Sequence, residues 1–267
     1  MITGAARGMG ELYARRAVSE GARAVSLWDM DEQAVTALAR ELEDQGAVVH
    51  VCTANLSRLE EIQHGVQQTL KAVGVPDVII NNAGVVRGAP FWEHDPVREI
   101  EGTMRVNALA PMWLTRELLP AMLADSSRHR RILNVASAAG TLANPNMSVY
   151  ASSKWALIGW SDSLRLELQK YGHSQILVTT FCPSYISTGM FAGARGPLLT
   201  PVMRPEQAVD AAWTGMLAGK PFVLRPWTVK LSMALRGVLP VTIWDAVAGK
   251  VFGVYSTMDK FTGRESN

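Results

Sequence analysis

The residues best suited to moving a proton are a tyrosine and a lysine four positions apart, Tyr150 and Lys154. They fall within residues 149–171, whose periodicity predicts a helix, so both side chains share one helix face. A free phenol has a pKa of about 10, and a neighbouring ammonium lowers that pKa because it favours the phenolate. The pair is therefore suited to exchange a proton with a bound oxygen near neutral pH. An ordinary surface tyrosine and lysine remain the alternative for this pair taken alone.

Two more polar residues are candidates for the same site. Ser137 follows a predicted strand at the end where ligands bind in parallel sheets, and its hydroxyl can hold a reacting oxygen. The alternative for Ser137 is a plain turn serine. Asn107 lies in an otherwise apolar stretch, where a buried amide needs partners. A water between Asn107 and Lys154 would give the proton a path to solvent, and the alternative is an amide that satisfies a helix kinked near Pro111.

A glycine-rich turn opens the chain and suits a phosphate-bearing ligand. The pattern T-G-x-x-x-G-x-G is formed by Thr3, Gly4, Gly8 and Gly10. Glycines let the backbone turn tightly and approach a pyrophosphate, and a helix that begins near Met9 points its positive end at the phosphates. A glycine-rich turn without a ligand is the alternative. Only Met1 and Ile2 precede the turn, so either the first strand is short or its true start lies upstream.

Asp29 bears on which dinucleotide the turn would hold. It ends a predicted strand about twenty residues further on, where a carboxylate accepts hydrogen bonds from the adenosine ribose and repels a 2′-phosphate. Arg7 favours the opposite preference, because a cation beside the turn can hold a 2′-phosphate. Since the repulsion at the ribose is direct, we expect NAD, with NADP as the alternative. Helix capping is the competing interpretation of Asp29, although Asp31 is better placed for that role.

Short apolar runs alternate with longer periodic segments along most of the chain. The runs that predict buried strands are residues 24–28, 47–51, 78–80, 131–135 and 176–181. The segments that predict helices are residues 9–20, 31–45, 59–73, 97–123 and 149–171. Such alternation is typical of βαβ units. We therefore expect one α/β domain over residues 1–267, a Rossmann-type doubly wound parallel sheet with helices on both faces.

The last third of the chain is less regular. Residues 185–205 are rich in Gly, Pro, Ser and Met and suit a mobile substrate loop over the carboxyl edge of the sheet. Residues 206–217 predict a helix and residues 222–224 a last strand. The C-terminal extension, residues 226–261, predicts about two amphipathic helices. It can cap a substrate pocket, pack on another subunit or lie on a membrane, and we rank the membrane last because the extension carries few Lys and Arg.

Composition excludes several classes of protein. With 48% hydrophobic residues among 267, the chain is too apolar to be disordered, and a net charge of +2 does not favour nucleic acid. The longest uncharged stretches are broken by Pro, Gly and Asn, so we expect no transmembrane span, and no secretory signal is visible. Two cysteines exclude a disulfide framework and favour the cytoplasm. The five histidines are dispersed, so no metal site is predicted.

Taken in order, these motifs resemble the short-chain dehydrogenase/reductase family over residues 3–224. The matching residues are TGAARGMG at 3–10, Asp29, NNAG at 81–84, Asn107, Ser137, YASSK at 150–154 and Pro183 through Thr188. The resemblance implies that Tyr150 is the catalytic acid and base, and that Lys154 binds the nicotinamide ribose and lowers the pKa of Tyr150. It also implies that Ser137 orients the substrate oxygen and that Asn107 completes a proton relay. LWDMDEQ at 27–33 and the apolar extension are similar, more loosely, to the retinol and hydroxysteroid dehydrogenase branch.

The resemblance also implies the cofactor contacts. They are Gly4, Arg7, Gly8, Met9, Gly10, Asp29, Asn55, Leu56, Asn82, Ala83, Gly84, Tyr150, Lys154, Pro183, Ser184, Ile186 and Thr188. Ile186 and Thr188 would hold the nicotinamide carboxamide. Asn55 stands where the family commonly has an aspartate that contacts adenine, and its oxygen can accept the same hydrogen bond. Ser184 replaces the usual glycine after Pro183.

The expected substrate wall is mostly apolar. Together with Ser137 it comprises Leu142, Asn144, Met147, Tyr185, Met190 and Phe191. Since no Arg or Lys is evident on it, we expect reversible hydride transfer between nicotinamide and a neutral hydrophobic secondary alcohol or ketone. The alternatives are an NADP-dependent acyl-thioester (3-oxoacyl) reductase and a non-catalytic dinucleotide-binding sensor. The family resemblance further implies a homotetramer or homodimer.

Overall fold

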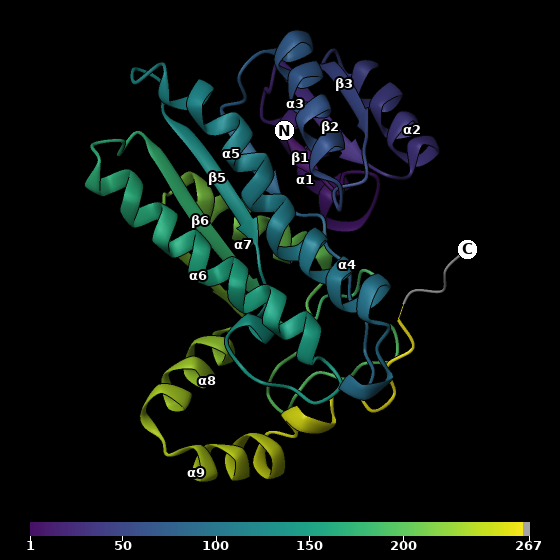
Figure 1. Ribbon diagram of the computed structural model, residues 1–267, viewed down its shortest axis with the longest axis vertical. Helices are drawn as coiled ribbons and strands as arrows, with labels where there is room; N and C mark the ends of the chain where they lie inside the picture. The colour runs from purple at the N-terminus through teal and green to yellow at the C-terminus, as the bar shows by residue number, and fades with distance from the viewer. Residues whose placement is uncertain (264–267) are drawn as a thin grey trace.

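Seven parallel strands form one sheet in the computed structural model, which describes residues 1–263 (Figure 1). The strands are β1 (Ile2–Thr3), β2 (Ala24–Asp29), β3 (Val48–Thr53), β4 (Val78–Asn81), β5 (Arg130–Val135), β6 (Ile176–Pro183) and β7 (Phe222–Arg225). Their spatial order is β3-β2-β1-β4-β5-β6-β7. The order reverses between β1 and β4, and open α/β sheets bind their ligands at such a switch point. The predicted doubly wound sheet is confirmed.

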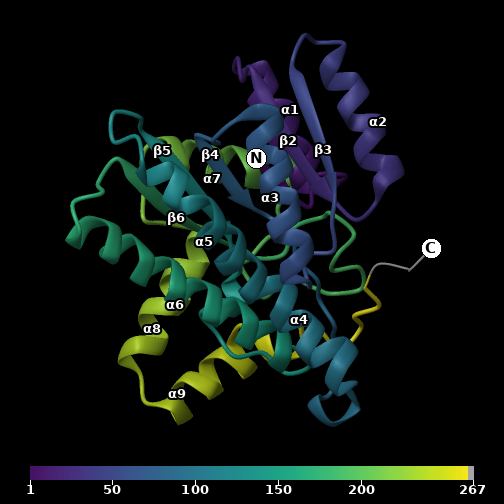
Figure 2. The same ribbon diagram turned by 45° about the horizontal axis from the view of Figure 1, so that its top comes forward.

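Helices cover both faces of this sheet, as the turned view in Figure 2 also shows. They are α1 (Gly8–Ser19), α2 (Glu32–Glu43), α3 (Leu59–Val73), α4 (Gly102–Met104), α5 (Ala110–Leu123), α6 (Ser148–Lys170), α7 (Pro205–Leu217), α8 (Trp227–Val238) and α9 (Val241–Ala246). Helices α1, α2 and α7 share one apolar core with the sheet, and α3, α5 and α6 share a second core on the other face. The two cores hold the strand ends in fixed positions, which a site at those ends requires.

The predicted helix at residues 97–123 is interrupted. It starts as a wide π-helical turn at Pro96–Glu101, passes through α4, and widens again at Arg105–Leu109 before α5 begins. Asn107 lies in the second wide turn, where its side chain bonds to the backbone of Val85. Periodicity misses such turns because each one displaces the apolar spacing by a single residue.

The first strand has only two residues, and it still fixes the glycine turn. Ile2 pairs with Leu27 of β2 and with Ile80 of β4. The buried hydroxyl of Thr3 accepts hydrogen bonds from the backbone N–H groups of Asn82 (3.0 Å) and Ala83 (3.1 Å). The turn that follows Thr3 is therefore tied to the end of β4 across the switch point.

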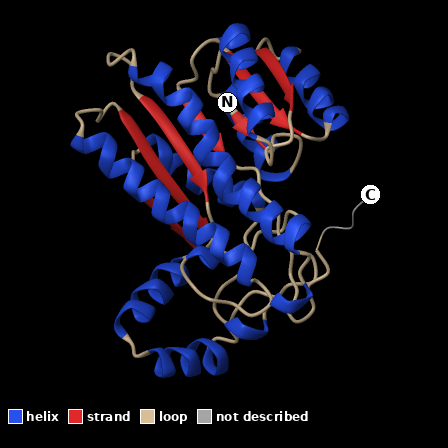
Figure 3. Cartoon of the chain, in the orientation of Figure 1, coloured by secondary structure: helices blue, strands red, loops and turns tan. Residues whose placement is uncertain are grey.

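The C-terminal extension folds as α8 and α9, in agreement with the two helices expected there. It packs against the active-site end of the sheet through a small apolar cluster of Leu142, Trp244, Ala248 and Val254. Figure 3 shows loops gathered between the strand ends and these helices. Within residues 1–263, no helix combines the length and the apolar character needed to cross a membrane.

Candidate active site

A cleft runs along the carboxyl ends of the strands and passes the switch point. Its walls include nearly all of the residues predicted to bind the cofactor: Gly4, Arg7, Gly8, Met9, Asp29, Leu56, Asn82, Ala83, Gly84, Tyr150, Lys154, Pro183, Ser184, Ile186 and Thr188. These residues come from six separate segments of the chain. The fold therefore brings the sequence motifs together into one continuous site.

The glycine turn forms one end of the cleft. Gly4 and Gly8 both have positive φ angles, +64° and +59°, which other residues rarely adopt. A Cβ on Gly4 would lie 2.9 Å from the Cα of Ala83, so only glycine allows this approach. Helix α1 begins at Gly8, and the N–H groups of its first turn and its positive dipole end are suited to a pyrophosphate. The cradle therefore fits a dinucleotide.

Asp29 lies on the cleft wall at the end of β2. Its two carboxylate oxygens accept hydrogen bonds from the backbone N–H groups of Ala6 (2.9 Å) and Asp31 (3.0 Å), which fix its orientation. Arg7 also lines the cleft, but its guanidinium pairs with the carboxylate of Asp31 at 2.5 Å. The carboxylate of Asp29 is thus held in a fixed orientation on the cleft wall, while Asp31 already engages the Arg7 cation.

Two residues predicted to touch the cofactor do not line the cleft. Gly10 lies inside α1, where a Cβ would overlap the carbonyl of Gly4, so its role is to let the helix pack on the turn. Asn55 turns away, because its Oδ1 accepts hydrogen bonds from the N–H (3.0 Å) and hydroxyl (2.8 Å) of Ser57. Its neighbours Ala54 and Leu56 line the cleft instead. The hydrogen bonds from Ser57 compete with adenine for the Asn55 oxygen. The sequence did not reveal this local turn.

Ser137, Tyr150 and Lys154 converge where the cleft passes β5 and α6. The hydroxyl of Ser137 caps the turn after β5 by accepting the N–H of Ala139 at 3.1 Å. It lies near enough to the Tyr150 hydroxyl to lower the pKa of that phenol. The ammonium of Lys154 donates to the carbonyl of Val135 at 2.9 Å and lies 5.8 Å from the centre of the Tyr150 ring. Tyr150 and Lys154 are each only 4% exposed. The three predicted catalytic side chains are therefore grouped and shielded from water.

Burial dominates the titration of this group. It raises the pKa of Tyr150 to about 12, against a smaller lowering by the hydrogen bond from Ser137. Burial also lowers the pKa of Lys154 to about 8, partly opposed by the nearby Cys182 thiol. Without a bound cofactor, burial is thus the dominant influence on the phenol pKa. The lowering expected from Lys154 together with a nicotinamide ring stays a prediction for the cofactor-bound protein. At neutral pH the phenol is protonated and the lysine charged, which is the form that donates a proton.

Asn107 is fully buried behind this group and does not line the cleft. Its Oδ1 accepts the N–H of Val85 (2.8 Å), and its Nδ2 donates to the Val85 carbonyl (2.8 Å) and to the Ser153 hydroxyl (3.0 Å). These bonds join the loop after β4 to α6 one residue before Lys154. A Cβ on Gly84 would lie 3.3 Å from this Oδ1 and 3.5 Å from the Lys154 ammonium, so the amide and the lysine flank the same glycine. Asn107 therefore holds in place the Val85 loop and the part of α6 that surround Lys154.

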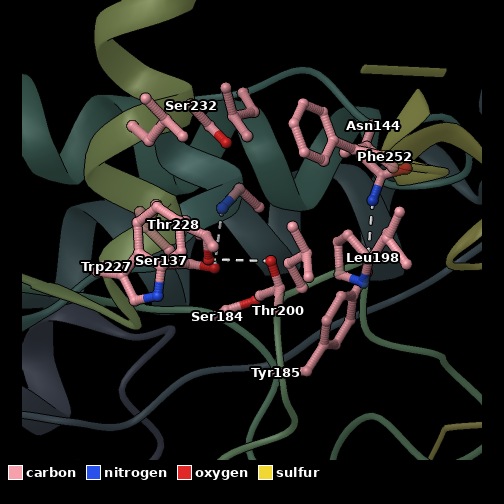
Figure 4. A pocket seen from close by; sticks show the side chains of 18 of the residues that line it. Ser137, Asn144, Ser184, Tyr185, Leu198, Thr200, Trp227, Thr228, Ser232 and Phe252 are labelled. Atoms are coloured by element: carbon pink, nitrogen blue, oxygen red, sulfur yellow. Dashed lines mark hydrogen bonds between the residues drawn. The ribbon is translucent and has the colours of Figure 1, made fainter. Parts of the chain in front are cut away.

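An apolar pocket adjoins the cleft and opens from Ser137 and Ser184, which line both (Figure 4). Of the predicted substrate wall, Leu142, Asn144, Met147, Tyr185 and Phe191 line this pocket. Met190 lines the cofactor cleft and not the pocket, whereas its neighbour Phe191 lines both. Phe191 lies between Tyr150 and Tyr185 with edge-on ring contacts at 5.8 Å and 5.3 Å.

Sequence reasoning offered the C-terminal extension as a cap for the pocket but named none of the residues in its other half. Its far wall consists of Pro197, Leu198, Leu199, Thr200, Trp227, Thr228, Val229, Leu231, Ser232, Leu235, Phe252 and Val254. A hydrogen bond of 2.9 Å between the hydroxyls of Thr200 and Thr228 joins the loop to α8. The apolar spacing 227, 231, 235 was a signal for this wall, but nothing in the sequence shows which side of α8 faces Ser137.

Comparison with known proteins agrees with this geometry. Residues 1–197 match the family model described as short chain dehydrogenase. The chain is 33% identical to rat (Rattus norvegicus) estradiol 17-beta-dehydrogenase 11, over 94% of this chain and 83% of that protein. It is 32% identical to mouse (Mus musculus) epidermal retinol dehydrogenase 2, over 99% of this chain and 85% of that protein.

A solved structure extends the comparison to the whole fold. The short-chain dehydrogenase from Sphingobium yanoikuyae in complex with NADPH superposes with a TM-score of 0.74 and is 27% identical. The match covers 94% of this chain and 92% of that one. The glycine turn, the switch-point cleft and the grouped serine, tyrosine and lysine thus occur in a chain that belongs to the short-chain dehydrogenase family.

Proposed function

We propose that the protein is an NAD(P)-dependent dehydrogenase or ketone reductase for neutral, hydrophobic secondary alcohols and ketones, with Tyr150 as acid and base. The observation that carries this proposal is the junction at Ser137. That serine lines both the dinucleotide cleft and the apolar pocket, and it lies near enough to the Tyr150 hydroxyl to lower the pKa of that phenol. A carbonyl at the inner end of the pocket would meet both hydroxyls and the nicotinamide end of the cleft at once.

The chain's own groups then serve orientation and proton transfer. When bound, the nicotinamide supplies or accepts the hydride. Ser137 and Tyr150 hydrogen-bond the substrate oxygen, and Tyr150 gives it a proton during reduction or removes one during oxidation. In reduction, the ketone carbon gains a hydride and its oxygen gains the Tyr150 proton, so the product is the neutral alcohol. Lys154 holds positive charge beside the phenol, and Asn107 keeps Lys154 and the Val85 loop in place.

Asp29 supports a preference for NAD over NADP. Its carboxylate is fixed by two backbone N–H groups on the cleft wall, and a 2′-phosphate beside it would be repelled. The Arg7 guanidinium on the cleft wall would offset that repulsion, but it already forms an ion pair with the Asp31 carboxylate. Because this ion pair is partly exposed, it weakens the competing preference and does not abolish it.

The apolar pocket supports the substrate class. Among the described residues that line it, none is Lys, Arg, Asp or Glu, so it offers no clamp for a carboxylate or phosphate. Two polar side chains on the pocket wall already have hydrogen-bond partners, since Asn144 and Tyr185 both donate to the Thr257 hydroxyl at 2.9 Å. This composition gives less support to the acyl-thioester reductase, whose substrate carries a charged carrier group.

Initial rates with NADH and NADPH across a panel of ketones test the proposal. We expect turnover of hydrophobic ketones, preferentially with NADH, and loss of turnover in Tyr150→Phe with dinucleotide binding retained. Turnover confined to charged acyl-thioesters would contradict the substrate class. Tight dinucleotide binding without turnover of any carbonyl would favour a sensor. The single domain over residues 1–267, the homodimer or homotetramer and the cytoplasmic location stay predictions.

A further inference from the structure

The mouth of the apolar pocket has an unusually apolar rim. Leu198, Leu199, Trp227 and Leu231 line the pocket, and they are also 59%, 65%, 61% and 39% exposed. Figure 4 shows Trp227 and Leu198 among the side chains around this pocket. An enzyme that takes its substrate from water has no need of such a rim, and exposed apolar patches mark interaction sites.

The exposed apolar surface continues along α8. Trp227, Leu231, Ala234 and Val238 are all exposed, and their spacing of four, three and four places them on one helix face. The opposite face, with Thr228 and Val229, is buried against the body of the protein. Val241 and Ile243 of α9 extend the exposed series, and both helices project from one end of the molecule (Figure 1).

A basic groove lies directly beside this apolar face. Arg195, Lys250 and Lys260 line it, together with a single acidic residue, Asp259. It shares Pro197, Leu198 and Phe252 with the wall of the apolar pocket, so the two features are contiguous. Within residues 1–263, no ion pair involves any of these three cations.

The segments of sequence next to the groove also carry mostly basic side chains. Residues 195–204 and 225–251 carry six basic side chains and one acidic side chain, Asp245. The basic ones are Arg195, Arg204, Arg225, Lys230, Arg236 and Lys250. The extension alone carries few cations, and for that reason we ranked membrane binding last among its three possible roles. The fold changes that ranking because it brings Arg195 of the preceding loop into one groove with Lys250 and Lys260 of the extension.

We propose that this end of the protein docks on an anionic lipid bilayer. The apolar face of α8 and the pocket rim would enter the interfacial layer, while Arg195, Lys250 and Lys260 would meet lipid phosphates. The pocket would then open toward the hydrocarbon, so that a hydrophobic substrate enters without crossing water. The inference of docking depends only on the apolar face and the basic groove. The inference that substrate enters from the bilayer also rests on the proposed function.

A second copy of this chain is the rival occupant of the apolar face. Two identical surfaces in a symmetric dimer would bring the two clusters of unpaired cations towards each other, which is unfavourable. An anionic bilayer satisfies the apolar and the basic parts together. The surface therefore matches lipid better than it matches itself.

Co-sedimentation with vesicles tests the docking. We expect the wild-type protein to sediment with phosphatidylcholine vesicles that contain phosphatidylglycerol, and not with phosphatidylcholine alone. Arg195→Ser/Lys250→Ser/Lys260→Ser should bind about a hundredfold more weakly, since each cation near a membrane is worth about fivefold. The matched control Arg23→Ser/Arg40→Ser/Lys71→Ser changes the net charge equally on exposed positions elsewhere and should bind as the wild type does.

A second pair of variants tests the apolar part. Val238→Asp/Val241→Asp should lose vesicle binding, while Val48→Asp/Leu217→Asp, also at exposed apolar positions, should keep it. The substituted valines lie outside the pocket lining, so turnover of a short, water-soluble ketone should not change in that variant. Because binding is measured without turnover, an inactive wild type that still binds vesicles contradicts only the proposed function.

Two results would overturn the proposal. One is a wild-type protein that ignores phosphatidylglycerol, or whose binding the two surface variants leave unchanged. The other is a wild-type oligomer that does not bind vesicles and that Val238→Asp/Val241→Asp converts to monomers in sedimentation velocity. That second result would assign the face to another copy of the chain.

Discussion

The dinucleotide cleft and the substrate pocket meet at Ser137 but are built in different ways. The cleft is formed by short segments at strand ends, and its shape depends on backbone features such as the positive φ angles of Gly4 and Gly8. The pocket's outer wall is formed by α8, by residues 197–200 of the loop before α7 and by Phe252 and Val254, all far along the chain from Ser137. The comparison shows that the cofactor half is fixed by local motifs and the substrate half by long-range packing.

The largest effect is expected at the junction of the two halves. Tyr150→Phe removes the proton donor and should lower turnover by about 10²- to 10⁴-fold, the usual range for a general acid. The affinity for NADH, measured by fluorescence titration, should stay within a factor of about two because the cleft walls are unchanged. A variant that loses NADH affinity as much as turnover would show that the phenol belongs to the cleft alone.

A substitution confined to the cleft should separate the halves. Asp29→Ala removes the carboxylate expected at the ribose and should raise the KM for NADH by about ten- to a hundredfold, the value of a hydrogen bond to a charged group. The KM for NADPH should fall, and the KM for the ketone should hardly change. Steady-state kinetics with both cofactors measures all three. An unchanged ratio of NADH to NADPH efficiency would refute the role given to Asp29.

The pH dependence of ketone reduction probes the junction again. Lys154, with its pKa lowered to about 8 by burial, is charged below that pH and neutral above it. We therefore expect the rate of reduction to be level on the acid side and to fall by about tenfold per pH unit on the alkaline side. A profile that stays level up to pH 10 would mean that the lysine charge is not required.

The smallest effect is expected in the pocket wall. Leu235→Ala shortens a side chain that lines the pocket from α8, and it should raise the KM for a bulky ketone by about tenfold. The KM for NADH and the kinetics with a small ketone should not change. If a small and a bulky ketone lose efficiency equally, α8 supports the fold and not the substrate.

The contrast between a cleft built from motifs and a pocket built by long-range packing also explains what the sequence could predict. The sheet and the helix faces followed from apolar periodicity, and most of the cleft residues followed from the resemblance to the short-chain dehydrogenase/reductase family. Gly10 and Asn55 do not line the cleft: Gly10 packs against the glycine turn and Asn55 caps a local turn, and spacing alone reveals neither contact. Met190 was placed in the pocket wall for a related reason, since only the path of the loop decides between the two cavities.

The electrostatics of the junction lay beyond sequence reasoning. A tyrosine and a lysine four residues apart suggest a phenol made more acidic, yet both groups lie in a water-excluded site. Desolvation then raises the pKa of one and lowers that of the other. Whether burial or the neighbouring charge dominates depends on the surrounding fold, which a spacing pattern does not contain.

The most direct test is an ultraviolet difference titration of the phenol, comparing the wild-type protein with Tyr150→Phe, with and without NAD⁺. The pKa of Tyr150 should be about 12 in the protein alone. It should fall clearly when the positively charged nicotinamide ring is bound beside it, because a nearby cation favours the phenolate. An identical titration with and without NAD⁺ would contradict the placement of the phenol at the meeting point of cofactor and substrate.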